Sequence, residues 1–164
     1  MYNPITIANY FIKRYSQDDN SLTPMKLIKL SYISYGWYLA MSNGEKLISE
    51  KPEAWDLGPV MPTLYHNLKK YGGKKVSEPI SDNLVSETIS DKDAKFLDFI
   101  WKKYQNFSGI QLSAITHTEG SPWSEIYPRG YNLVIPDELI KEHYDIKLNE
   151  ALEIAKSNKE PQVS

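Results

Sequence analysis

The chain has 164 residues, of which 24% are charged, 12% are aromatic and none is cysteine, and its formal net charge is -2. This length suits a single domain with its own core, and the missing cysteines exclude disulfides, thiol catalysis and thiolate metal sites and fit a reducing compartment. The small negative charge excludes a general electrostatic attraction to nucleic acid, so any such binding would have to be local.

The first predicted helix begins near Asn3 or Thr6, either of which is suited to cap it, and runs to about Ser16. Apolar residues recur in it at helical spacing and form one buried stripe. These residues are Ile5, Ala8, Phe11, Ile12 and Tyr15. Residues 17–21 then form a polar connection to the next helix.

The second predicted helix occupies residues 22–41 and organises the rest of the chain. Thr23 is suited to cap it, and Pro24 suits the first helical position, where a missing N–H costs nothing. Charge occurs only at Lys26 and Lys29, and every later position is apolar, aromatic, Ser or Gly. We therefore expect a helix that enters from solvent at the two lysines and is then surrounded by protein.

Residues 45–58 are predicted to be irregular or extended, with 53–57 as one short strand or edge segment. Pro59 or Pro62 opens a third helix, which ends at the glycine pair 72–73. Its inward residues are Val60, Leu64, Tyr65 and Leu68. The segment 74–89 alternates weakly at Val76, Ile80, Leu84, Val85 and Ile89, which is typical of either a loop or a small hairpin.

A fourth helix is predicted over residues 90–105, capped by Ser90, and a fifth over 109–118, capped by Ser108. The expected inward residues are Phe96, Leu97, Ile100, Trp101 and Tyr104 in the fourth helix, and Ile110, Leu112, Ala114 and Ile115 in the fifth. Pro122 starts a brief turn of helix that lasts to about residue 127.

The apolar run 133–135 is predicted to pair with residues 53–57 as a small sheet, and Pro136 opens a last helix. The inward face of that helix comprises Leu139, Ile140, Tyr144, Leu148 and Leu152. The sequence thus predicts a mainly α fold: one compact domain over residues 1–156, with six to seven helices around a buried central helix and a small β element. Residues 157–164 form a polar C-terminal tail that frays.

The N-terminal residues MYNPITIANYF have neither the basic region nor the cleavage site of a signal peptide. No run of about 18 apolar residues is present that would span a membrane. We therefore expect a cytoplasmic protein that does not contact a membrane.

The three histidines, His66, His117 and His143, show none of the local spacings of a metal site. We expect His117 to make structural hydrogen bonds, although His66 and His117 lie where they could approach one another. A triad of Ser113, His117 and a distant carboxylate is the alternative, because triads are defined in space. No Gly-x-Ser-x-Gly or phosphate-binding loop is present, so we expect no enzyme, no cofactor and no metal.

Four lysines, Lys69, Lys70, Lys74 and Lys75, follow the third predicted helix. Cations at a helix C-terminus complement the helix dipole, so a solvated surface is the first interpretation. The alternative is a patch that meets an acidic protein surface or a phosphate backbone. Because the chain is negative overall, we favour a protein over nucleic acid.

Four tryptophans dominate the aromatic content, and Trp37 and Trp101 lie on predicted core faces. Trp55 and Trp123 stand beside Gly-Pro and Ser-Pro breakers, where a ring either pins a loop to the core or anchors a partner. Tyr65 and Tyr71 are open to both interpretations.

Three stretches together resemble a known family. They are LTPMKLIKLSYISYGWYL at 22–39, EAWDLGPVMPTLYHNLKKYG at 53–72 and LSAITHTEGSPW at 112–123. In this order and at these separations they are similar to the Panacea domain, the SocA-like family of bacterial and phage antitoxins also described as phage-associated proteins. The resemblance implies a mostly helical fold with a small β element, and an antidote that acts on a cognate toxin by direct protein contact.

One member of this family delivers its toxin to a cellular unfoldase-protease and others inhibit by binding alone; the residues do not choose between these routes. The resemblance implies that toxin contacts come from the shared domain or from the segment after about Glu150. The candidate partner-binding or family-motif residues are Trp55, Tyr65, His66, Lys69, Lys70, Lys74, Lys75, His117 and Trp123.

Two other functions are kept as alternatives. The lysine cluster is the support for a DNA-binding autorepressor of the operon. His66 and His117 are the support for an enzyme. The identity of the toxin and the oligomeric state are not predicted.

Overall fold

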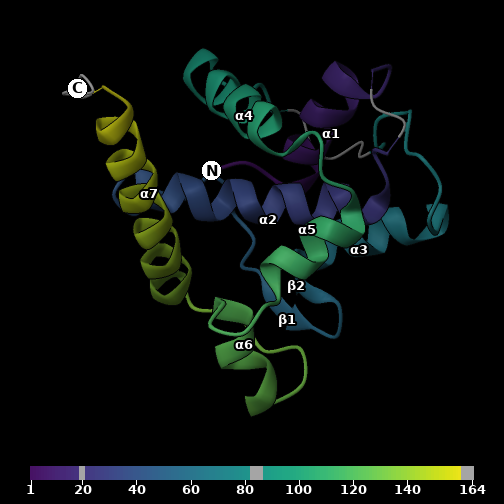
Figure 1. The fold of residues 1–164 in the computed structure, drawn as a ribbon. Helices are drawn as coiled ribbons and strands as arrows, with labels where there is room; N and C mark the ends of the chain where they lie inside the picture. Colours follow the sequence, from purple (N-terminus) through teal and green to yellow (C-terminus); the bar gives the residue numbers. More distant parts are fainter. Residues whose placement is uncertain (19–20, 82–86, 160–164) are drawn as a thin grey trace.

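The computed structural model describes residues 1–18, 21–81 and 87–159. In these ranges the chain forms seven α-helices, two 3-10 turns and one two-stranded sheet (Figure 1). The elements are α1 (Pro4–Tyr15), α2 (Pro24–Met41), β1 (Glu53–Trp55), β2 (Gly58–Val60), α3 (Pro62–Leu68), η1 (Lys69–Tyr71), α4 (Asp91–Tyr104), α5 (Gly109–Thr116), α6 (Pro122–Ile126), η2 (Tyr127–Arg129) and α7 (Asp137–Lys159). The predicted mainly helical fold with a small β element is confirmed.

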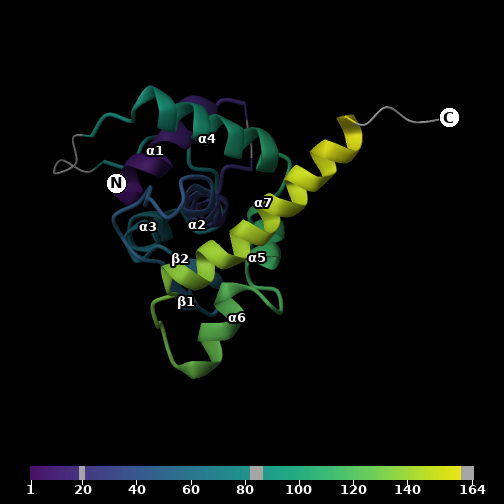
Figure 2. The ribbon, with the colours of Figure 1, turned by 90° about the vertical axis from the view of Figure 1, so that its left-hand side faces the viewer.

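Helix α2 lies at the centre of the molecule and contacts α1, α4, α5 and α7. Figure 2 shows it end-on with the other helices around it. Thr23 caps it by accepting a hydrogen bond from the backbone N–H of Lys26, and every residue from 26 to 40 is buried. The predicted central helix is therefore confirmed, although Met41, expected on an apolar face, is exposed.

One prediction about this helix is wrong, because Lys26 and Lys29 do not face solvent. Their exposed fractions are 0% and 2%. Helix α5 approaches the first turn of α2 closely, and a Cβ on Gly109 would lie 2.8 Å from the backbone nitrogen of Lys26. Since α5 and the β-hairpin cover this end, α2 begins inside the protein.

Helix α7 packs its first half against α2 and leaves its second half free. The ring of Tyr144 lies on Gly36, where an added Cβ would come within 2.1 Å of it. In Figure 2 the C-terminal end of α7 projects away from the other helices, and residues 151–159 are exposed. Leu152 was therefore wrongly predicted to be inward. The helix itself extends to Lys159, so it includes the first residues of the predicted tail.

The small sheet differs from the prediction in its main pairing. Strand β1 pairs with β2 in an antiparallel hairpin, with Glu53 opposite Val60. The predicted pairing with residues 133–135 is also present as a short extension, in which Ala54 N–H donates to the Leu133 carbonyl at 2.8 Å. Gly58, with φ of +106°, permits the turn between the strands.

Two further expectations were wrong in detail. Ile110 is 77% exposed and Ala114 is exposed, because α5 turns Leu112 rather than these residues toward α2. Tyr65 is 38% exposed rather than inward. Of the two alternatives for 74–89, the described part is a loop without strands, and Leu84 and Val85 lie outside the described residues. No helix in the described ranges is long and apolar enough to cross a membrane.

Candidate functional site

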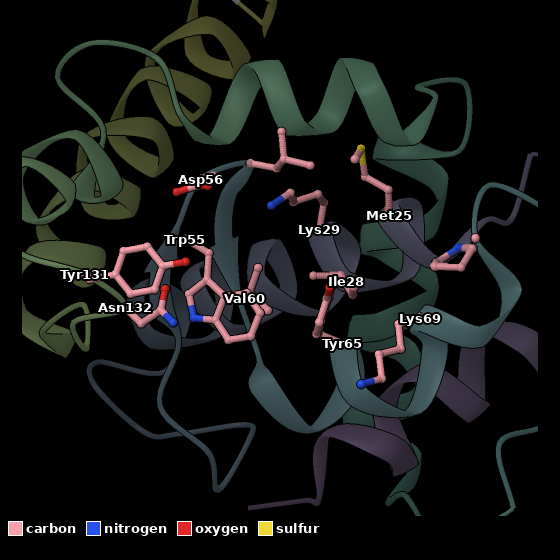
Figure 3. A pocket seen from close by; sticks show the side chains of 13 residues that line it. Met25, Ile28, Lys29, Trp55, Asp56, Val60, Tyr65, Lys69, Tyr131 and Asn132 are labelled. Carbon is pink, nitrogen blue, oxygen red and sulfur yellow. The ribbon is translucent and has the colours of Figure 1, made fainter.

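A cavity of about 630 Å³ opens between the first half of α2, the β-hairpin, α3 and the segment 131–132 (Figure 3). Most of its wall is apolar, and its polar groups are few. The main lining side chains are Met25, Ile28, Lys29, Trp55, Asp56, Leu57, Val60, Tyr65, Lys69 and Tyr131. This size and character are typical of sites that bind a small ligand or a few residues of a partner.

The hairpin positions Trp55 on the cavity wall. The indole N–H of Trp55 donates to the Glu53 carboxylate at 2.8 Å, and its ring meets the Tyr65 ring edge-on at 4.9 Å. Behind the hairpin, the indole N–H of Trp123 donates to the carbonyl of Trp55 at 2.7 Å. Trp55 and Tyr65 therefore face the cavity, whereas Trp123 fixes the hairpin from the other side.

Lys29 belongs to the cavity lining although almost all of its surface is covered. Its Nζ donates a hydrogen bond of 2.9 Å to the Pro59 carbonyl. Figure 3 shows the amino group directed toward the hairpin. A Cβ on Gly58 would lie 2.9 Å from Nζ, and the φ of +106° at this position itself favours glycine. Burial lowers the pKa of Lys29 to about 7, because the charged form is poorly solvated there.

Ser113 and His117 lie together, as the alternative triad requires, but both also contact backbone carbonyl oxygens. Ser113 Oγ donates to the Leu57 carbonyl at 2.7 Å, and His117 Nδ1 lies 3.4 Å from that hydroxyl. His117 Nδ1 also contacts the carbonyl oxygen of Ser113. The Ser113 hydroxyl proton is thus directed at a backbone oxygen, and the pair ties α5 to the turn of the hairpin.

The two candidate histidines are linked through tryptophans. His66 packs edge-on against Trp55 at 6.1 Å, and His117 packs edge-on against Trp123 at 5.2 Å. Within the described residues, no group of three or more His, Cys, Asp or Glu side chains is arranged to hold a metal ion.

The four candidate lysines do not form one feature with the cavity. Lys69 lies in its lining, near Tyr65. Lys70 and Lys74 are exposed and Lys75 is half-buried, and these three lie outside the lining. Lys70 and Lys74 thus face solvent after α3, while Lys75 is partly covered.

Sequence reasoning missed Lys29, Asp56, Leu57 and Tyr131 as members of a site. A signal was present for Lys29, because it follows Met25 by one helical turn and adjoins Ile28 on the apolar face. A lysine at that spacing either buries its amine with the apolar face or interrupts that face. For Tyr131 no local pattern pointed to the cavity.

Comparison with known proteins defines the class. The family described as "Antitoxin SocA-like, Panacea domain" matches residues 27–124, which is more than half of the chain, and the chain therefore belongs to this family. Antitoxin SocA of Caulobacter vibrioides (strain NA1000 / CB15N) is 26% identical over 151 residues, covering 84% of this chain and 80% of that protein. No solved structure matches the chain.

Proposed function

We propose that this protein is an antitoxin that neutralises a cognate toxin by direct contact at the cavity beside the β-hairpin. Membership of an antitoxin family is the observation that carries the proposal. The matched segment, 27–124, contains Lys29, the hairpin, Tyr65 and Lys69, which form most of the cavity.

The rim of the cavity has the character of a protein-binding surface. Leu57 is 60% exposed, Tyr131 78% and Tyr65 38%, and all three lie in its lining. Exposed apolar and aromatic side chains around a concave opening are typical of contact sites, where a partner's side chain fills the opening and the rim excludes water.

Coexpression with the product of the neighbouring reading frame tests this function. The wild-type protein should restore growth and co-purify with that product. Leu57→Asp puts a charge on the rim and should lower the affinity for that product at least about tenfold. Both growth rescue and co-purification should then decrease. Phe99→Asp on α4 is a matched control, since Phe99 is 43% exposed and lies outside the cavity lining. Failure of the wild-type protein to rescue or to co-purify would contradict the proposal.

Delivery of the toxin to an unfoldase-protease is a finer version of the same function. It requires a second free surface, and the projecting end of α7, exposed over residues 151–159, provides one. Removal of residues 151–164 should then leave toxin binding intact and lengthen the half-life of the toxin in cells. An unchanged half-life of the toxin would indicate that the protein inhibits it by binding alone.

A DNA-binding autorepressor is supported by the exposed lysines Lys69, Lys70 and Lys74. Binding to the DNA upstream of the operon should then weaken steeply with salt. No retardation of that DNA at low salt would dismiss this alternative. The net charge of -2 favours the toxin as the partner.

A further inference from the structure

The amino group of Lys29 has fewer partners than its chemistry allows. A protonated amine carries three N–H donors. Within the described ranges, Nζ of Lys29 donates to one acceptor, the Pro59 carbonyl, at 2.9 Å. The side chain is 2% exposed, so bulk water does not replace the missing partners. A buried donor without a partner is costly, and a cavity beside it is where a partner would enter.

The other charged groups of the cavity do not meet this need. Asp56 accepts a hydrogen bond of 2.8 Å from the hydroxyl of Tyr127, and no ion pair joins it to Lys29 in the part of the chain that the structure describes. Lys69 is exposed at the rim and adds positive charge. The cavity therefore combines a buried amine, a second cation, apolar walls and one carboxylate that is bonded to Tyr127.

We propose that this cavity binds a carboxylate group of the toxin that is carried beside an apolar side chain. The inference rests on the proposed function. The carboxylate accepts the remaining N–H donors of Lys29, and such charge-assisted hydrogen bonds are strong where water is excluded. The neighbouring apolar side chain of the toxin packs against Ile28, Val60 and Trp55.

A bound carboxylate also changes the protonation of Lys29. In the free protein burial lowers its pKa to about 7, and a nearby negative charge raises the pKa of an amine again. Binding at pH 8 is therefore accompanied by proton uptake. Duplex DNA fits the site less well, because its bases are stacked inside the helix and its exposed phosphates bring no apolar side chain to fill the walls.

The first experiment uses two probes that differ only in their C-terminal group: acetylated dileucine with a free C-terminal carboxylate, and the same dipeptide with a neutral C-terminal amide. Binding at pH 6 is followed by the NMR signal of the Trp55 indole N–H. The acid should bind at least about tenfold more tightly than the amide. Equal binding of acid and amide would overturn the proposal.

Substitutions then test whether Lys29 causes the preference. Lys29→Met keeps an unbranched side chain that is one atom shorter, removes the amine and should abolish the preference for the acid while the amide still binds. Lys29→Gln is a second, polar variant for the case that Met does not fold. Lys95→Met on α4 is the matched control, because Lys95 is exposed and outside the lining. An unchanged preference in either Lys29 variant would contradict the role assigned to the amine.

The second experiment measures affinity for the toxin encoded by the neighbouring reading frame. Lys29→Met should bind it at least about tenfold more weakly than the wild-type and Lys95→Met proteins do. If the wild-type protein does not bind the toxin, the proposed function fails. If wild-type and Lys29→Met proteins bind it equally, the proposed function stands and the carboxylate inference fails.

Discussion

The two lysines at the start of α2 lie one turn apart and are both buried, but their surroundings differ. Lys26 Nζ donates to the carbonyl of Gln105 at 2.7 Å and to Ser21 Oγ at 3.1 Å, and it lies 5.0 Å from the centre of the Trp101 ring. Lys29 Nζ has one carbonyl acceptor and a cavity beside it. The comparison separates a lysine that holds the fold together from one that is available to a ligand.

The difference arises from what covers each side chain. Around Lys26, the end of α4 supplies the Gln105 carbonyl and the Trp101 ring. Around Lys29, the hairpin supplies the Pro59 carbonyl, and the cavity lies beside the side chain. A buried charge whose hydrogen bonds are satisfied within the chain is structural, whereas one with donors left over beside an opening is a candidate for binding.

Replacement of Lys26 should have the largest effect on stability. Lys26→Met removes the donor to Gln105 and to Ser21 and the contact with Trp101, so the free energy of unfolding should fall by about 3 kcal/mol. Urea denaturation at pH 7 measures this change. Lys92→Met, at an exposed site on α4, is the control and should change it by less than about 0.5 kcal/mol. An unchanged denaturation midpoint in Lys26→Met would contradict the stabilising role assigned to Lys26 and its difference from Lys29.

Replacement of Lys29 should act in the opposite direction at low pH. The pKa of Lys29 is about 7 in the folded protein and has its ordinary value of 10.5 when unfolded. Between these two pH values the unfolded chain binds more protons than the folded protein does, so the free energy of unfolding of the wild-type protein rises with pH. Below pH 7 Lys29 is protonated in both states, and the penalty for the buried charge is complete. Lys29→Met escapes that penalty and loses only the bond to Pro59. It should be about 2 kcal/mol more stable at pH 6.

This advantage of Lys29→Met should shrink to near zero by pH 9, because much of the penalty on the wild-type protein has then disappeared. The difference between two denaturation series, at pH 6 and pH 9, cancels contributions from other titrating groups that the variants share. A difference that stays constant with pH would show that Lys29 does not titrate in this range.

Ser113 separates the structural interpretation of the His117 pair from the enzymatic one. Ser113→Ala removes the hydrogen bond to the Leu57 carbonyl and should lower the free energy of unfolding by about 1 kcal/mol. Protection against the toxin should be unchanged at a temperature where the variant is folded. Complete loss of protection by a folded protein that still binds the toxin would instead support a catalytic role.

Tyr131 should show the smallest effect on stability and a clear one on binding. It is 78% exposed, so Tyr131→Ala should change the free energy of unfolding by less than about 0.5 kcal/mol. Its ring lines the cavity opposite Met25 and Lys69 in Figure 3, and its loss should weaken toxin binding about fivefold. Unaltered affinity in a binding titration would place the toxin elsewhere on the surface.

Local signals in the sequence predicted most helix starts. Asn3, Thr23, Ser90 and Ser108 each cap the helix expected from them, because a cap depends only on the residues that follow it. Exposure was less predictable. Ile110, for example, is exposed although its helix was predicted, because the rotation of α5 on α2 depends on contacts from distant segments.

The candidate site was predicted in part. The structure places Trp55, Tyr65 and Lys69 in one cavity, as residues that the family resemblance and the breaker patterns had singled out. His117 and Trp123 hold the hairpin from behind. Lys29 was missed because its burial results from the hairpin folding over α2. Its place beside Met25 and Ile28 was the only local signal, and it does not show what covers the amine.

The pH titration of Lys29 in isotopically labelled protein, followed by the NMR signal of its Cε carbon, tests the central claim most directly. In the free protein the midpoint should lie at about 7, as expected for a buried amine. It should move upward when the toxin is bound. A midpoint at the ordinary value of 10.5 in the free protein, or one that toxin binding leaves unchanged, would contradict the account.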